Sequence, residues 1–261
     1  MAGIRQAKRL LAVPLAVATG YYGALLARLS PERHQRFMRR RIRGPYRGAL
    51  ADRLMTIVDD LGRTQDEQGA MAAAATAIRE ALELGEFDRW IDRDNMGDGK
   101  ATLIECGDFL PGRSWKLQLF FIPEGHSHPP HSHSDVASCL VVAKGKLHAR
   151  EYNRSHDLER DTDHAMLSLA SDRRLARGDT LLTTRTSNDV HWFGAVDGPA
   201  VAFNFQAVGF RRGRKPFESR RVYVDATAVA GTGVHRAAML TRKAAKLRFA
   251  ERPLSDFPLK S

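Results

Sequence analysis

The stretch from Glu124 to Gly145, EGHSHPPHSHSDVASCLVVAKG, places four histidines within eight residues. They are His126, His128, His131 and His133. The apolar run KLQLFFIP (Lys116 to Pro123) precedes them, and the apolar run SCLVVA (Ser138 to Ala143) follows. This pattern predicts two β-strands joined by a histidine-rich turn. Neutral imidazole is the commonest protein ligand of transition metals, so the turn is a candidate metal site.

His131 and His133 are the first candidate ligands. They lie two residues apart, and an extended strand places alternate side chains on the same face. A third imidazole would complete a facial set, and His191 in SNDVHWFG is the best candidate downstream. His128 is an alternate ligand, although it is out of phase with His131 in a regular strand.

Length and composition indicate a soluble globular protein. The chain has 261 residues, of which 43% are apolar and 27% charged, which suffices to bury a real core. Two cysteines, Cys106 and Cys139, make no disulfide framework, which is consistent with a reducing compartment. We therefore expect a cytoplasmic location.

The excess positive charge is concentrated at the N-terminus. Residues 1–50 contain eleven Lys or Arg residues and one acid, Glu32, so they carry +10 of the formal net charge of +11. The other residues are close to neutral. Nucleic-acid binding is not expected, because no recognisable nucleic-acid-binding module accompanies the arginine run.

Inside this basic arm, the eighteen residues from Leu10 to Ala27 carry no charge. Three interpretations remain open: a packed helix or loose tail, membrane association of residues 1–47, and a secretory signal. Arginines that directly follow the apolar segment oppose translocation and fit a membrane anchor with a cytoplasmic arginine side.

The spacing of apolar residues along the sequence changes near Ala101, from a helical pattern to short β-type runs. Before it, residues 49–62 and 66–84 are expected to form two helices that pack on the following domain. After it, eight or nine short β-type runs predict an all-β sandwich or barrel. We expect residues 1–30 to form an apolar and basic segment, 31–91 a helical region, 92–225 the barrel and 226–261 an extension with a basic helix in HRAAMLTRKAAKLRFAE.

A family resemblance rests on two motifs. The pattern Gly125-x5-His131-x-His133-x4-Ser138-x6-Gly145 is similar to the first motif of the cupin superfamily, and Gly178 through His191 resembles the second. The resemblance implies a double-stranded β-helix, or jelly-roll barrel, in which ligands from two strand regions converge. It also implies a homodimer paired through barrel edges. Most metal-binding cupins have a glutamate at the position of Ser138.

A narrower resemblance is to thiol dioxygenases of the cysteine dioxygenase type. They share the EGH-x4-HxH spacing and a Pro-Ala-Val strand after the third histidine, here GPAVAFNF. This implies Fe(2+), dioxygen and a small anionic substrate, with a carboxylate-binding arginine that aligns with Arg93. The family's active-site tyrosine aligns with Gln206 and its outer-sphere histidine with Asn204. Asn204, Gln206 and Arg93 are thus candidate contacts to substrate or oxygen.

Three functions are considered. The leading one is a mononuclear iron(II) oxidoreductase, with another divalent transition metal as an alternative. A three-histidine site leaves the +2 charge of the ion uncompensated and keeps positions open for substrate and oxygen. The alternatives are a non-catalytic metal- or ligand-binding cupin, such as a sensor, and a metal-dependent isomerase or lyase.

Overall fold

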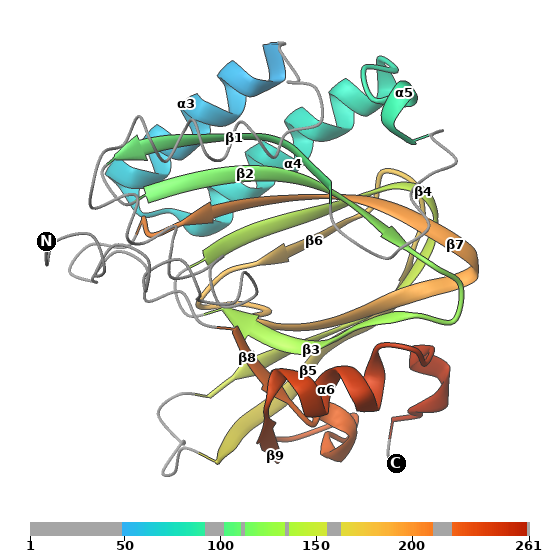
Figure 1. Ribbon diagram of the computed structural model, residues 1–261. Coiled ribbons are helices and arrows are strands. Elements are labelled where there is room, and N and C mark those ends of the chain that lie inside the picture. The colour runs from blue at the N-terminus through green and yellow to red at the C-terminus, as the bar shows by residue number, and fades with distance from the viewer. Residues whose placement is uncertain are drawn as a thin grey trace, which may run out of the picture.

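The computed structural model describes residues 49–91, 102–110, 113–133, 136–155, 163–210 and 221–259. Within them, two long helices precede a nine-stranded sheet that is closed into a barrel (Figure 1). The helices are α3 (Ala49–Thr64), α4 (Glu67–Glu83), α5 (Asp88–Ile91) and α6 (Arg242–Phe249), with the 3-10 turns η3 (Ala226–Ala228) and η4 (Leu254–Asp256). The strands are β1 (Thr102–Leu110), β2 (Arg113–Ile122), β3 (Ser127–His133), β4 (Val136–Arg154), β5 (His164–Leu175), β6 (Thr180–Thr183), β7 (Val190–Val208), β8 (Arg221–Val224) and β9 (His235–Leu240).

Two long antiparallel strands, β4 and β7, organise the barrel. Each has 19 residues, and they pair with each other along most of their length. Residues 200–208 of β7 lie between β2 and β4, whereas residues 190–194 lie between β3 and β4. The ring then closes through β8, β9 and β5. The predicted all-β jelly-roll barrel with a helical N-terminal region is confirmed.

A glycine lies where β4 passes from one half of the barrel to the other. Gly145 has φ +74°, a left-handed conformation that glycine adopts without strain. A Cβ there would lie 2.3 Å from the carbonyl oxygen of Pro199 on β7. The two strands therefore approach closely at the point where the sequence runs SCLVVA and KLHAREY join into one strand.

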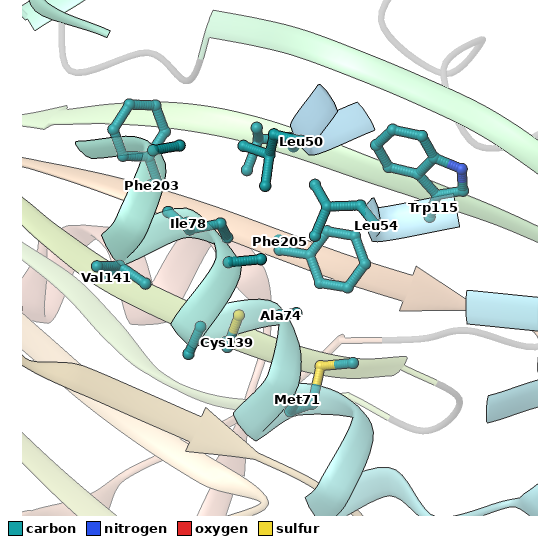
Figure 2. Packing of buried hydrophobic residues seen from close by; sticks show 14 of the residues in the cluster. Leu50, Leu54, Met71, Ala74, Ile78, Trp115, Cys139, Val141, Phe203 and Phe205 are labelled. Carbon is teal, nitrogen blue, oxygen red and sulfur yellow. The ribbon is translucent and has the colours of Figure 1, made fainter. Parts of the chain in front are cut away.

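Helices α3 and α4 cover the outer face of the half that contains β1, β2 and β6 (Figure 1). Alternation along β4 and β7 sends every second side chain outward to meet them. Figure 2 shows these side chains facing α4. They include Cys139, Val141, Phe203 and Phe205, all fully buried. The two helices therefore pack on the barrel, as expected from the sequence, and share one continuous apolar core with it.

The C-terminal segment covers the outer face of the opposite half. Trp192 of β7 packs against Phe249 and Phe257, with ring centroids 5.0 Å away in each case. Ser127, the first residue of β3, donates its hydroxyl to the carbonyl of Phe249 at 2.7 Å. Trp192 Nε1 in turn donates to Ser127 Oγ at 3.2 Å. These contacts join the end of α6 to the strand that carries the histidines.

Two local predictions differ from the structure. The helix expected over residues 235–251 is a strand, β9, followed by the shorter helix α6. The helix begins at Arg242 and is capped by Thr241, whose hydroxyl accepts a hydrogen bond from the Ala244 amide. The sheet therefore continues past residue 225, where the sequence predicts the barrel to end. The histidine-rich turn is also partly a strand, β3, which pairs with β7 and β8.

No helix among the described residues is long and apolar enough to cross a membrane. The apolar segment Leu10 to Ala27 and the whole of residues 1–47 lie outside the described residues, so their membrane association stays a prediction.

Candidate metal centre

Three histidines meet inside the barrel. His131 and His133 come from β3, and His191 from β7 is paired in register with His131. Their candidate ligand atoms all lie within 4.8 Å of one another. The ring centroids are 4.4 Å apart for His131 and His191, 4.9 Å for His131 and His133, and 5.6 Å for His133 and His191. The structure thus brings together the three residues that the sequence predicts as ligands.

Hydrogen bonds leave a free nitrogen on each ring. His131 Nδ1 lies 2.8 Å from the carbonyl oxygen of Pro129, which can only accept, so Nδ1 carries the proton and Nε2 keeps its lone pair. His191 Nδ1 lies 3.1 Å from Thr183 Oγ1, and this contact orients the ring. His133 Nε2 is buried without a partner among the described residues. Metal-binding histidines are typically oriented through the other ring nitrogen in this manner.

All three imidazoles are held neutral. Burial lowers the pKa of His131 and His133 well below the usual value, with the neighbouring His191 as the next cause. Burial and then the charge of Arg221 lower the pKa of His191 from 6.5 to about 3. A neutral imidazole is the form that binds a metal. Three such nitrogens suit first-row transition ions such as iron, zinc, copper or nickel.

The histidines form part of a narrow pocket between the two halves of the barrel. The pocket is lined by Phe120, His128, His131, His133, Ser138, Leu140, Leu181, Thr183, His191, Phe193, Asn204, Gln206 and Arg221. No acidic residue is among these lining residues. The described lining therefore offers no carboxylate to an ion bound by the three histidines.

The wall contributed by β4, β6 and β7 has one row of polar side chains and one row that combines two leucines with an amide. Ser138 is paired with Thr183 on one side and with Gln206 on the other. Two residues further along β4, Leu140 is paired with Leu181 and Asn204. Paired residues of an antiparallel sheet point to the same face. Serine, threonine and amide groups therefore lie side by side in the pocket.

Comparison with known proteins shows similarity over about half of the chain. No family model and no curated protein matches. An oxalate oxidase structure is 21% identical, covering 53% of this chain and 62% of that chain, with a TM-score of 0.32. KdgF from Halomonas sp. is 16% identical, covering 42% and 88%, with a TM-score of 0.27. A cupin superfamily protein from Desulfitobacterium hafniense DCB-2 is 13% identical, covering 42% and 76%, with a TM-score of 0.27. Similarity at this level does not extend to activity.

The other predicted site residues fall into three groups. Asn204 and Gln206 are buried, 6% and 4% exposed, and both line the pocket. His128 lines the pocket but stands outside the group of three ligand atoms. Arg93 lies outside the described residues, so its contact to substrate stays a prediction.

Two polar residues of the pocket, Thr183 and Arg221, were not predicted from the sequence. Thr183 ends the short strand β6 and orients His191. Arg221 begins β8, is paired with His133 and lies exposed at the pocket. Its charge lowers the pKa of all four pocket histidines. Only the pairing of β8 with β3 places Arg221 here, and no local pattern in RVYVD signals that pairing.

Proposed function

We propose that the chain is a cupin-type mononuclear iron(II) oxidoreductase that resembles the thiol dioxygenases. It would oxidise a small anionic substrate with dioxygen. The observation that carries the proposal is the set of three neutral imidazoles without an acidic residue among the described residues that line their pocket. Such a set binds a divalent ion and leaves coordination positions for exogenous ligands, unlike a closed structural site with four protein ligands.

The residues of the chain would each have a definite task. His131, His133 and His191 would hold the ion, which supplies the redox chemistry when bound. Ser138 stands where most metal-binding cupins have a glutamate, and its small side chain leaves that position open. Thr183 would keep Nε2 of His191 turned toward the ion, because its hydroxyl is bonded to Nδ1.

Arg221 supports an anionic substrate. Among the described residues, no acidic side chain pairs with its guanidinium, which lies exposed at the pocket that contains the histidines. A guanidinium binds carboxylates well because its planar fork matches both oxygens. On this view Arg221 attracts and orients the substrate anion, a task that the family resemblance assigns to Arg93.

The remaining walls would exclude water and position the substrate. Phe120, Phe193, Leu140 and Leu181 supply apolar surface beside the histidines. Asn204 and Gln206 supply hydrogen bonds from the opposite wall. An amide is neither an effective acid nor an effective base at neutral pH, so these two residues would orient the substrate rather than transfer protons.

Asn204 and Gln206 stand where the thiol dioxygenases have an outer-sphere histidine and an active-site tyrosine. The loss of those two groups supports a second candidate, a metal-binding cupin without turnover. One experiment separates the two functions. Oxygen uptake by the iron-loaded protein is followed on adding mercaptoacetate, with the His133→Ala variant as the control. Thiol-dependent uptake that disappears in the variant supports the dioxygenase. Mercaptoacetate binding without uptake would contradict it and support the binding protein.

A further inference from the structure

His128 is a fourth imidazole in the pocket, and the three-histidine centre does not need it as a ligand. Its ring lies 5.5 Å from that of His131, measured between centroids. It lines the same pocket, but its nitrogens stand outside the group of ligand atoms. The residue was predicted from the sequence as an alternate ligand, and the geometry suggests a different task.

Two phenyl rings hold the imidazole of His128 in one orientation. Phe120 and Phe193 both stack on it, with centroids 5.4 and 5.1 Å away and interplanar angles of 21° and 24°. His128 and Phe193 are also paired in register between β3 and β7. The ring plane is therefore set by strands that also carry the histidine centre.

The hydrogen-bonding groups of this ring are not used within the described part of the protein. Nδ1 is buried and has no partner among the described residues. A buried N–H without an acceptor is rarer and costlier than a bare acceptor, so the proton belongs on Nε2. Nε2 is not among the buried nitrogens without a partner, and it is the ring nitrogen left to reach the pocket that His128 lines.

We propose that the Nε2–H group of His128 donates a hydrogen bond to the anion that binds at the three-histidine centre. The inference rests on the proposed function, since it requires an ion that binds an exogenous anion. Arg221 then supplies its guanidinium from the exposed side of the pocket, whereas His128 supplies one further donor beside the histidine centre. Together they define a substrate with an acceptor atom close to the ion, rather than any anion that enters the pocket.

The test uses the full-length protein loaded with cobalt(II), with azide as the probe and the visible absorption of cobalt as the readout. His128→Phe keeps the aromatic stack and removes the donor, and we expect it to bind cobalt normally but azide about tenfold more weakly. His128→Gln restores an N–H donor near the same place and should recover part of the affinity. His126→Phe is the matched control, because His126 bonds the Glu124 carbonyl and does not line the pocket.

Each other outcome overturns the proposal. Loss of cobalt in His128→Phe would show that His128 is a ligand. Unchanged azide affinity in that variant, or equal weakening in His126→Phe, would show that the Nε2–H group is not a contact. A wild-type protein that takes up no cobalt would overturn the proposed function and this inference with it.

Discussion

His131 and His191 face each other across adjacent strands, paired in register between β3 and β7, with their ring centroids 4.4 Å apart. The pairing fixes their separation through backbone hydrogen bonds rather than through a loop. A site on paired strands is more precise than a site on loops. The centre is therefore preorganised, and changes to the residues that orient its histidines should alter metal affinity.

Removing the hydroxyl that orients His191 should weaken metal binding. We expect Thr183→Val to lower the affinity for iron(II) or cobalt(II) by about 10- to 100-fold, the usual effect of deleting a partner of a metal-binding histidine. Thr183→Ser keeps the hydroxyl and should stay near the wild-type affinity. Competition with a chelator measures both variants. Equal affinities in the valine and serine variants would mean that the bond to Nδ1 does not orient the ring.

The charge of Arg221 should distinguish anionic from neutral substrates. Arg221→Gln is expected to weaken binding of mercaptoacetate about tenfold, because a charge-assisted hydrogen bond is lost. Binding of 2-mercaptoethanol, which lacks the carboxylate, should change little. Titration of the cobalt-loaded protein with each thiol gives both constants. Arg236→Gln serves as the control, since Arg236 bonds His164 and does not line the pocket. A similar loss for both thiols would contradict the role of Arg221.

The stability of the metal-free protein should fall as the pH decreases below 6.5. Burial lowers the pKa of His191 from 6.5 to about 3, so between these values the unfolded chain binds a proton that the folded chain does not. The free energy of unfolding then falls by up to about 1.4 kcal/mol per pH unit for each such histidine. The contribution of His191 to the free energy of unfolding should level off above pH 7, where the imidazole is neutral in both the folded and the unfolded chain.

Urea unfolding of the metal-free protein at pH 7.5 and 5.5 checks this sign. The wild type should lose more stability between the two pH values than His191→Asn, which has one titrating imidazole fewer. An equal loss in both proteins would show that His191 does not remain neutral in the folded state. Metal affinity should fall over the same pH range, because protons compete for the ligand nitrogens.

The close approach of β4 and β7 can be tested at Gly145. Gly145→Ala combines a left-handed φ with a Cβ 2.3 Å from the Pro199 carbonyl oxygen, so we expect a loss above about 2 kcal/mol of unfolding free energy. Gly178→Ala is the matched control. Gly178 also has a positive φ, +87°, but a Cβ there would meet nothing within 4 Å, so the loss should be about 1 kcal/mol. Equal losses would exclude the steric contribution.

Local sequence patterns were sufficient for the barrel strands and for the pair His131 and His133, whereas His191 was chosen as a downstream candidate with support from the family resemblance. The largely apolar runs SCLVVA and AVAFNFQAV identify the two central strands, and HxH on an extended segment places two imidazoles on one face. These signals depend on neighbours in sequence. Asn204 and Gln206 are two residues apart on β7, so strand alternation places them on one face, and both line the pocket.

Arg221, Thr183 and the strand β9 were not predicted because their positions depend on long-range pairing. Arg221 reaches the histidines only through β8 lying beside β3, and Thr183 only through β6 lying beside β4. In β9, the sequence HRAAML contains good helix formers, and pairing with β5 and β8 overrides that preference. Within residues 235–251, helix propensity therefore predicted the right structure only for the residues after Thr241.

Metal content tests the three-histidine centre most directly. The wild-type protein, His131→Ala and His148→Ala are purified without oxygen and analysed for bound metal. His148 is the control, because it pairs with Asp172 and does not line the pocket. We predict close to one transition-metal ion per chain in the wild type and in His148→Ala, and almost none in His131→Ala, with its fold retained by circular dichroism. Equal metal content in wild type and His131→Ala, or no metal in either, would contradict the proposed centre.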